Sequence, residues 1–152
     1  MKVLVFSDSH RSLRSMRDAV ELEKPDFLIH LGDLEEDAEN LAAEYPRLPL
    51  TSVAGNCDGW IVHGPLQRTA VYGGKRVLLS HGHIWRVKSG YDAAIAEARR
   101  AGVDILLFGH THTAYCERME DGLWVMNPGS VRDGDYGVIV PDAAKPCSLR
   151  HI

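Results

Sequence analysis

Five short apolar runs constrain this chain most, because each one leads to a polar side chain that can bind a metal. The runs span residues 3–6, 27–31, 50–54, 77–79 and 105–108. Continuous runs rich in Val, Ile and Leu are typical of strands that are covered on both faces. The polar residues that follow are Asp8 and His10, Asp33, Asn56, His81, and the pair His110 and His112. If these strands are parallel neighbours, the polar side chains converge on one rim of the molecule.

Helical patterns separate several of these runs. The first is expected over residues 12–23, with Ser12 as its N-cap and Lys24-Pro25 as its end. A second is expected over residues 34–45, and a third over residues 89–101 with Gly102 just past its end. This alternation of strand and helix predicts largely parallel pairing among the strands.

The later part of the chain carries hairpin patterns. Residues 68–72 and 75–79 flank Gly73-Gly74, and residues 114–119 and 123–126 flank Asp121-Gly122. A further strand is expected over residues 136–140, and the longest loop over residues 58–65. We therefore predict an α/β fold with two stacked sheets and helices outside, in place of one doubly wound sheet.

Length, charge and cysteine content limit the kinds of protein that this chain can be. A chain of 152 residues predicts one domain over 1–152, and a net charge of −4 without a basic stripe argues against a stable nucleic-acid complex. Three widely spaced cysteines, Cys57, Cys116 and Cys147, predict no disulfide framework and a reducing cytoplasmic location. The apolar start ends at Asp8, which is too short for a signal peptide or a membrane span, so we expect no membrane association.

The candidate ligands combine imidazole and carboxylate groups. This mixture suits manganese, iron or zinc better than magnesium or calcium alone. Glycines at positions 32, 55 and 109 come directly before candidate ligands and permit tight turns there. His110 and His112 alternate like residues at a strand end, so a turn after Gly109 must redirect one of them if both bind metal.

The spacing of these residues resembles the calcineurin-like metallophosphoesterase superfamily. That family has the ordered pattern D-x-H, G-D, G-N-x-D/E, H and G-H-x-H. The corresponding blocks here are Asp8-Ser9-His10, Gly32-Asp33, Gly55-Asn56-Cys57-Asp58, His81-Gly82-His83 and Gly109-His110-Thr111-His112. The later turn Asn127-Pro128-Gly129-Ser130 is similar to the small single-domain YfcE-type phosphodiesterase branch.

The resemblance implies a fold, a cofactor and a reaction. The fold would be a four-layer α-β-β-α sandwich of two mixed sheets flanked by helices. Two divalent ions would share a hydroxide and hydrolyse a small phosphate ester, with manganese as the first choice and iron, nickel or zinc as alternatives. The first ion would be held by Asp8, His10 and His112 and the second by Asn56, His81 and His110, while Asp33 would bridge both. Catalytic roles would fall to Asp33, Asn56, Cys57 and Asp58. This arrangement requires Asp33 to lie within a side-chain length of both Asp8 and His81.

Two positions depart from the wider superfamily. Cys57 stands where many relatives have a histidine that is thought to protonate the leaving group, so we expect a preference for esters with good leaving groups. Arg11 stands where many relatives have glycine, and either contacts substrate phosphate or is a solvated side chain at a helix start.

Three functions remain open at this point. The leading one is a phosphodiesterase, the second is a phosphomonoesterase acting on nucleotides or phosphoproteins, and the third is a non-catalytic protein-binding scaffold. The resemblance also admits a homodimer. The sequence assigns neither the natural substrate nor the physiological metal, and it leaves the roles of His63 and His83 open. His30, inside an apolar run, is expected to be a buried histidine with its hydrogen bonds satisfied.

Overall fold

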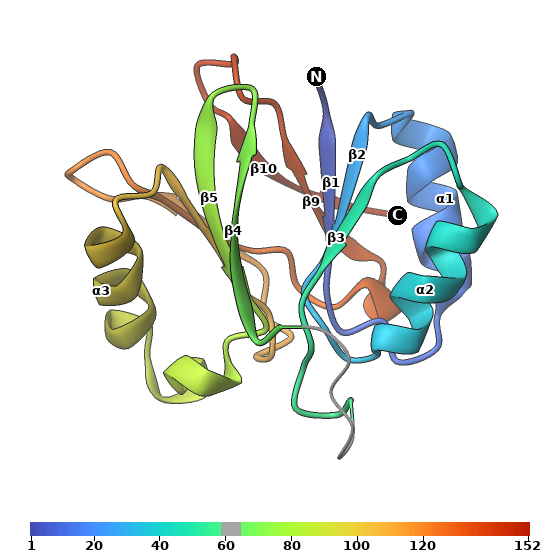
Figure 1. Ribbon diagram of the computed structural model, residues 1–152, viewed down its shortest axis with the longest axis horizontal. Coiled ribbons are helices and arrows are strands. Elements are labelled where there is room, and N and C mark those ends of the chain that lie inside the picture. The colour runs from blue at the N-terminus through green and yellow to red at the C-terminus, as the bar shows by residue number, and fades with distance from the viewer. Residues whose placement is uncertain (59–64) are drawn as a thin grey trace.

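The chain forms two stacked sheets, and the first two apolar runs of the sequence become neighbouring strands of the first sheet (Figure 1). The computed structural model describes residues 1–58 and 65–152. The sheet has the order β10-β9-β1-β2-β3, and β1, β2 and β3 are parallel, while β9 and β10 are antiparallel to their neighbours. Its strands are β1 (Val3–Phe6), β2 (Phe27–His30), β3 (Leu50–Ser52), β9 (Asp135–Ile139) and β10 (Cys147–His151).

The second sheet has the order β4-β5-β6-β8-β7 and is also mixed. Its three central strands β5, β6 and β8 are parallel, and the edge strands β4 and β7 run antiparallel to them. The bounds are β4 (Gln67–Tyr72), β5 (Lys75–Ser80), β6 (Ile105–Leu107), β7 (Tyr115–Arg118) and β8 (Trp124–Asn127).

Helices cover the outer face of each sheet. Helices α1 (Leu13–Glu23) and α2 (Glu35–Glu44) lie outside the first sheet, and α3 (Asp92–Ala101) lies outside the second (Figure 1). Short 3-10 turns lie at His83–Trp85, Val87–Ser89 and Val131–Asp133. The result is four layers in the order helix, sheet, sheet, helix, which confirms the predicted fold class.

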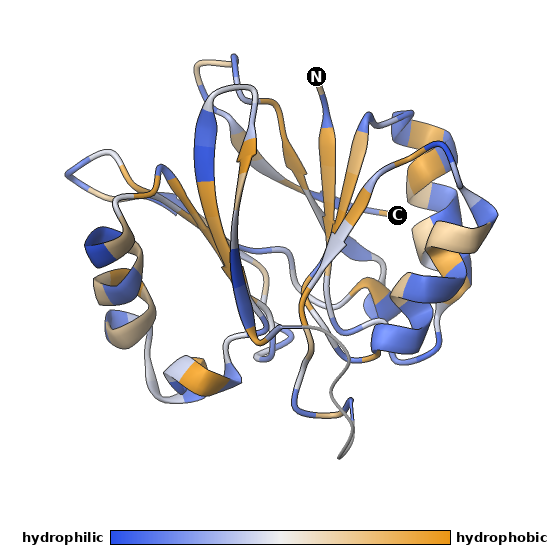
Figure 2. Cartoon of the chain, in the orientation of Figure 1, coloured by the Kyte–Doolittle hydropathy of each residue, from blue (hydrophilic) through white to orange (hydrophobic). Residues whose placement is uncertain are grey.

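Three apolar clusters hold these four layers together. In β1, Val3 and Val5 face the other sheet, and Leu4 faces helices α1 and α2, because successive strand residues point to opposite faces. In the second sheet, Leu79 faces the first sheet and Leu78 packs with α3. Figure 2 shows the central strands coloured mainly as hydrophobic, with hydrophilic residues along the helices. Both sheets are therefore buried on two sides, as their continuous apolar runs predict.

The boundaries differ from expectation in two places. Strand β10 was not predicted, and α3 begins at Asp92 because 3-10 turns occupy the segment before it. Ser12 is the N-cap residue of α1, as predicted, but its side chain makes no cap hydrogen bond. Lys24 ends the helix in a left-handed conformation, just before Pro25 as predicted.

Some expectations lie outside the described residues. These are most of the loop expected over 58–65 and, within it, any role of His63. Within the described ranges, none of the helices combines the length and the apolar character that a membrane crossing needs.

Candidate metal centre

The carboxyl ends of β1, β2, β5 and β6 bring candidate ligands from both sheets to one place. Ligand atoms of Asp8, Asp33 and His81 all lie within 4.8 Å of one another, and those of Asp8, His10 and His112 form a second such group. Asp33 therefore lies close to both Asp8 and His81, as the sequence-based arrangement requires. These side chains come from segments up to a hundred residues apart, so the fold itself assembles the cluster.

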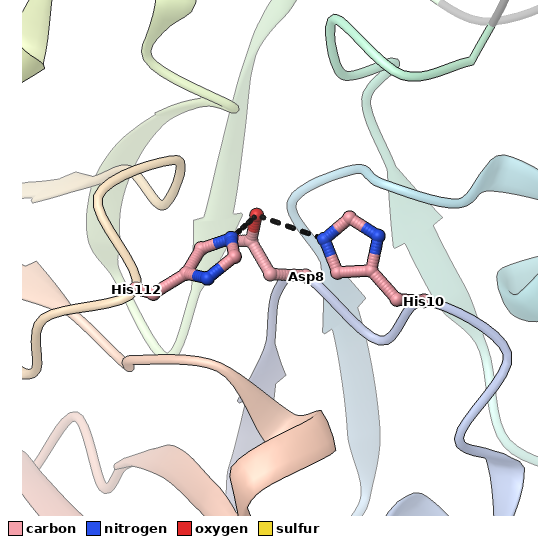
Figure 3. A group of neighbouring side chains, drawn as sticks. All are labelled: Asp8, His10 and His112. Atoms are coloured by element: carbon pink, nitrogen blue, oxygen red, sulfur yellow. Dashed lines mark ion pairs between the residues drawn. The ribbon is translucent and has the colours of Figure 1, made fainter.

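Asp8 belongs to both groups. Figure 3 shows its carboxylate between the rings of His10 and His112. Its Oδ1 atom is 3.0 Å from Nε2 of His112, 3.7 Å from Nε2 of His10 and 3.8 Å from Nε2 of His81. The other oxygen, Oδ2, accepts hydrogen bonds from the Ser7 hydroxyl at 2.6 Å and the His110 N–H at 3.1 Å. One oxygen is thus fixed by the protein while the other faces three imidazole nitrogens.

Asp33 joins the two sides of the cluster. Its Oδ2 atom lies 3.4 Å from Nε2 of His81 and 4.0 Å from Nε2 of His10. Its Oδ1 atom accepts a hydrogen bond from the Cys57 N–H at 2.9 Å. Burial acts to raise the pKa of Asp33, but the interactions with His81 and the Cys57 N–H outweigh it and hold the pKa below its usual range. The carboxylate is therefore ionised at neutral pH.

His81 has a defined orientation. Its Nδ1 lies 2.9 Å from the Leu31 carbonyl, which can only accept, so Nδ1 carries the proton. In the neutral ring this leaves the lone pair of Nε2 facing Asp33 and Nδ1 of His110, which is 3.2 Å away. Burial would lower the pKa of His81, but Asp33 and Asp8 raise it above its usual value. A proton and a cation would therefore compete for this nitrogen.

Positive φ angles concentrate in the loops around the cluster. Among the described residues, eight that are not glycine have positive φ, and six of these belong to the site loops. The six are Asp8, His10, Arg11, Asp33, His110 and His112. Residues two apart with one between them at a strand end would normally follow the strand's alternation of faces. The left-handed conformations of His110 and His112 remove this constraint, because the chain turns there and does not continue as a strand. Such conformations cost energy and are found where a site requires them.

Unpaired polar atoms test whether these residues fit a cation. Within residues 1–58 and 65–152, three buried side-chain polar atoms have no hydrogen-bond partner, and two of them are Asp8 Oδ1 and His10 Nε2. Leaving buried polar atoms unpaired is costly. The separations of 3.0 to 4.0 Å between donor atoms approach the spacing of ligands around an ion bound at about 2.1 Å. The residues present fit a divalent metal.

The block from Asn56 to Asp58 follows β3. Asn56 and Cys57 are exposed, and the Asn56 amide contacts Cys57 Sγ at 3.7 Å. The Asp58 carboxylate accepts hydrogen bonds from the N–H groups of Gly55, Asp33 and Glu35. Burial and the Asp33 charge raise the pKa of Cys57 to about 11, so its thiol is protonated at neutral pH. Asp58 ties this loop to the Asp33 loop through the backbone.

Supporting hydrogen bonds come from Ser7, which no sequence motif pointed to, and from both ends of the Asn127–Ser130 turn. Ser7 binds the Asp8 carboxylate, Ser130 donates to the Asp8 carbonyl at 2.8 Å, and Asn127 donates to the Gly109 carbonyl at 3.1 Å. Asn127 also donates to the Thr111 hydroxyl at 2.9 Å. The Asn-Pro-Gly-Ser turn was expected near the site, and its role in holding the Gly109 loop adds to that expectation.

His83 and Arg11 border the cluster. The His83 ring centroid lies 5.6 Å from that of His81, and its Nδ1 is the third buried atom without a partner among the described residues. Burial lowers the pKa of His83. Arg11 is exposed, and its N–H donates to the Asp37 carboxylate at 2.6 Å.

Comparisons with known proteins identify the family to which the chain belongs. The model of the calcineurin-like phosphoesterase superfamily domain matches residues 1–140. The chain is 35% identical over 136 residues to "Probable metallophosphoesterase YsnB" of Bacillus subtilis, covering 87% of this chain and 76% of that protein. It is 26% identical over 151 residues to "Phosphodiesterase MJ0936" of Methanocaldococcus jannaschii, covering 85% and 83%.

Solved structures share the fold. A Streptococcus pneumoniae protein described as a "predicted phosphoesterase" superimposes with a TM-score of 0.80 at 21% identity, covering 99% of this chain and 88% of that one. Vps29 of Entamoeba histolytica gives 0.77 at 18% identity, covering 100% and 98%. The phosphoesterase YfcE of E. coli gives 0.66 at 20% identity, covering 100% of both chains. The chain therefore belongs to the calcineurin-like phosphoesterase superfamily, a family of metal-dependent phosphoesterases.

Proposed function

We propose that the protein is a phosphodiesterase that works with two divalent ions at this centre. Asp8, His10 and His112 would hold the first ion, and Asn56, His81 and His110 the second, with Asp33 between them. The observation that carries the proposal is the pair of carboxylate oxygens, Asp8 Oδ1 and Asp33 Oδ2, surrounded by imidazole nitrogens at 3.0 to 4.0 Å. Manganese is the first candidate, with iron, nickel and zinc next, because imidazole and carboxylate together suit borderline ions.

The ions would supply Lewis acidity that lowers the pKa of a water molecule and neutralises charge on the phosphoryl oxygens. The chain's own residues prepare that centre. The Leu31 carbonyl holds His81 with its Nε2 lone pair inward, and the Cys57 N–H holds Asp33. Such outer contacts orient ligands and fix their tautomers. Only two carboxylates face the proposed ions, so positive charge remains to attract an anionic ester.

Two observations support a diester over a monoester. Asn56 and Cys57 are exposed beside Asp33, so the described part of the rim is open to an ester with two substituents. The turn from Asn127 to Ser130 is similar to the YfcE-type phosphodiesterase branch, and one relative bears the name phosphodiesterase. We therefore place the monoesterase reading second.

Hydrolysis of a chromogenic aryl phosphodiester tests the proposal. The purified chain, loaded in parallel with manganese, iron, nickel or zinc, should turn over the diester, while Asp33→Ala should fall to the level of the buffer. The monoester of the same alcohol should react more slowly. No turnover above Asp33→Ala with any of the metals would overturn the proposal, and faster monoester hydrolysis would favour a phosphomonoesterase.

Metal analysis separates an enzyme from a scaffold. Protein purified without chelators should carry close to two equivalents of a transition metal, and Asp33→Ala should carry fewer. A wild-type chain with little bound metal and no turnover would favour the protein-binding scaffold.

A further inference from the structure

A buried chain of hydrogen bonds lies directly behind the proposed metal centre. The Gly32 N–H donates to Nδ1 of His30 at 3.1 Å, and Nε2 of His30 lies 2.9 Å from the Ser9 hydroxyl. The Ser9 hydroxyl in turn donates to Oδ2 of Asp37 at 2.6 Å. His30 and Ser9 are fully buried and Asp37 is 3% exposed, so water does not compete for these groups. We refer to Gly32, His30, Ser9 and Asp37 as the relay.

Each hydrogen bond of the relay is donated in the same direction, from Gly32 toward Asp37. The Gly32 N–H can only donate, so Nδ1 of His30 must be the acceptor. Burial lowers the pKa of His30 to about 4 despite the nearby carboxylates, so the ring is neutral and its proton is on Nε2. Nε2–H then donates to Ser9, and the single Ser9 proton goes to Asp37. The Asp33 carbonyl, at 3.4 Å from the Ser9 hydroxyl, is a more distant acceptor than Asp37 at 2.6 Å, and a proton on Nδ1 of His30 would leave the buried Gly32 N–H without an acceptor.

The relay connects the two loops that carry the carboxylates. Ser9 lies between Asp8 and His10 in the chain, and Gly32 directly precedes Asp33. Asp8, His10 and Asp33 all have positive φ, so both loops are held in uncommon conformations. Backbone hydrogen bonds from Asp8 N–H to Gly32 and from His10 N–H to Asp33 also join the loops. The relay adds a side-chain connection that continues to α2, where Asp37 lies and where its Oδ2 also accepts a hydrogen bond from the Arg11 N–H at 2.6 Å.

We propose that His30 is a positioning residue of the metal centre. Its ring spans the gap between the loop after β2 and the loop after β1, and so sets the separation of Asp33 from Asp8 and His10. The inference rests on the metal-binding role given above to these three residues. A purely structural His30 would contribute stability alone, whereas a positioning His30 also sets metal affinity.

Four variants separate these roles. His30→Leu removes both ring nitrogens, and Ser9→Ala removes the middle of the relay. His30→Asn keeps an acceptor near the Nδ1 position, and His30→Gln keeps a donor near the Nε2 position. The control is Val138→Ala in β9, a buried truncation in the apolar cluster beneath α1 and α2, on a strand that β1 separates from the His30 strand β2. For each variant, urea unfolding without metal gives stability, and competition with a chelating indicator gives the manganese affinity.

We expect His30→Leu and Ser9→Ala to weaken manganese binding about 10- to 100-fold, the usual effect of losing a group that orients a ligand. Ser9→Ala should add little when His30→Leu is already present, because both break the same relay. His30→Asn and His30→Gln should fall between these and wild type. The electron paramagnetic resonance spectrum of bound manganese should change in His30→Leu. Val138→Ala should lose stability while its affinity stays within about twofold of wild type.

The outcomes are distinguishable. If wild type binds manganese and His30→Leu binds it equally well, the inference is overturned while the proposed function stands. It is also overturned if Val138→Ala loses as much affinity as His30→Leu at equal stability. If His30→Leu fails to fold, Ser9→Ala decides by the same comparison. A wild-type chain that bound no divalent ion would overturn the proposed function, and the inference with it.

Discussion

Two glycines lie so close to the site that a single added carbon would displace its acidic groups. A Cβ on Gly55 would lie 2.1 Å from Oδ1 of Asp33, and a Cβ on Gly109 would lie 2.0 Å from the Ser7 hydroxyl and 2.8 Å from Oδ2 of Asp8. Neither glycine has a left-handed φ, so the need for glycine here comes from close approach. Steric exclusion of a Cβ thus explains why glycine precedes the ligand in the Gly55-Asn56 and Gly109-His110 blocks.

Gly55→Ala tests this steric cause. The added methyl group must displace the Asp33 carboxylate, so we expect manganese affinity and turnover to fall by at least about tenfold. Gly74→Ala is the control, because Gly74 has a φ of +83° but nothing within 4 Å of its Cβ position. It should lose about 1 kcal/mol of stability through backbone strain and keep its metal affinity. Equal affinity losses in both variants would contradict the steric account.

Cys57 makes a second residue-scale prediction. A thiol with a pKa near 11 is a poor acid at neutral pH, so departing alkoxides receive little help. Cys57→His should raise the rate on diesters with poor leaving groups by at least about tenfold relative to aryl diesters, because general acid catalysis is worth about 10²–10⁴-fold. Cys57→Ser is the control and should leave that ratio unchanged. An unchanged ratio in Cys57→His would refute the idea.

His30 makes stability depend on pH. Its pKa is lowered to about 4 in the folded state, so the unfolded chain takes up this proton first as the pH falls below about 6.5. Its contribution is therefore fully present above pH 6.5 and is lost toward pH 4. Between pH 7 and 4.5, metal-free wild type should lose roughly 2–3 kcal/mol more than His30→Asn in urea unfolding. Parallel losses in the two proteins would contradict this, since the other titrating groups are common to both.

At the scale of elements, side chains that bind backbone groups hold the site loops in place. Asp58 ties the loop after β3 to the loop after β2, and Asn127 at the end of β8 holds the loop after β6. Loops with so many fixed backbone groups present their ligands with little freedom, which favours tight binding. Asp58 therefore acts on the site through the backbone of Gly55 and Asp33.

Asp58→Asn tests that role. The amide replaces one acceptor oxygen by a donor that faces backbone N–H groups, so the free energy of unfolding should fall by about 1–3 kcal/mol. Manganese affinity should fall as well, because both ligand loops lose their connection. Asp121→Asn is the control, since Asp121 also accepts a backbone hydrogen bond, from Leu123, but lies in an exposed turn. Chemical denaturation and indicator competition measure both effects, and unchanged affinity in Asp58→Asn would contradict the role.

Most of the fold could be predicted from the sequence, and the features that could not be predicted have physical reasons. Continuous apolar runs identify doubly covered strands, which is why the layers were predictable. Strand β10 alternates Cys147 and Leu149 toward the core with polar residues outward, a weaker pattern that follows a proline and was overlooked. The site residues were recognisable by type and order. The left-handed conformations of His110 and His112 were not predictable, because histidine adopts positive φ more often than most residues but still only in a small minority of positions.

At the scale of the whole molecule, the two sheets share the site. Asp8 and Asp33 follow strands of the first sheet, while His81, His110 and His112 follow strands of the second. A bound ion would therefore link the sheets in addition to binding substrate. Any ligand that binds only the folded state stabilises it according to its concentration and affinity.

Thermal unfolding measures this link. Manganese at about 100 times its dissociation constant should add about 2.7 kcal/mol of stability, which corresponds to roughly 5–10 °C in Tm for a chain of this size. Excess chelator should reverse the shift, and Asp33→Ala should show little of it. A shift of equal size in Asp33→Ala would mean that manganese binds elsewhere.

The apolar cluster between the sheets has a consequence for which ions the protein accepts. Residues such as Val5, Leu79 and Met126 fill the space between the two sheets and keep them apart. The carboxylates reach the rim from the first sheet and most imidazoles from the second. The thickness of the apolar layer between the sheets therefore sets the distance between these two sets of ligands. The size of a core side chain far from any ligand thus influences how large a cation the site can bind.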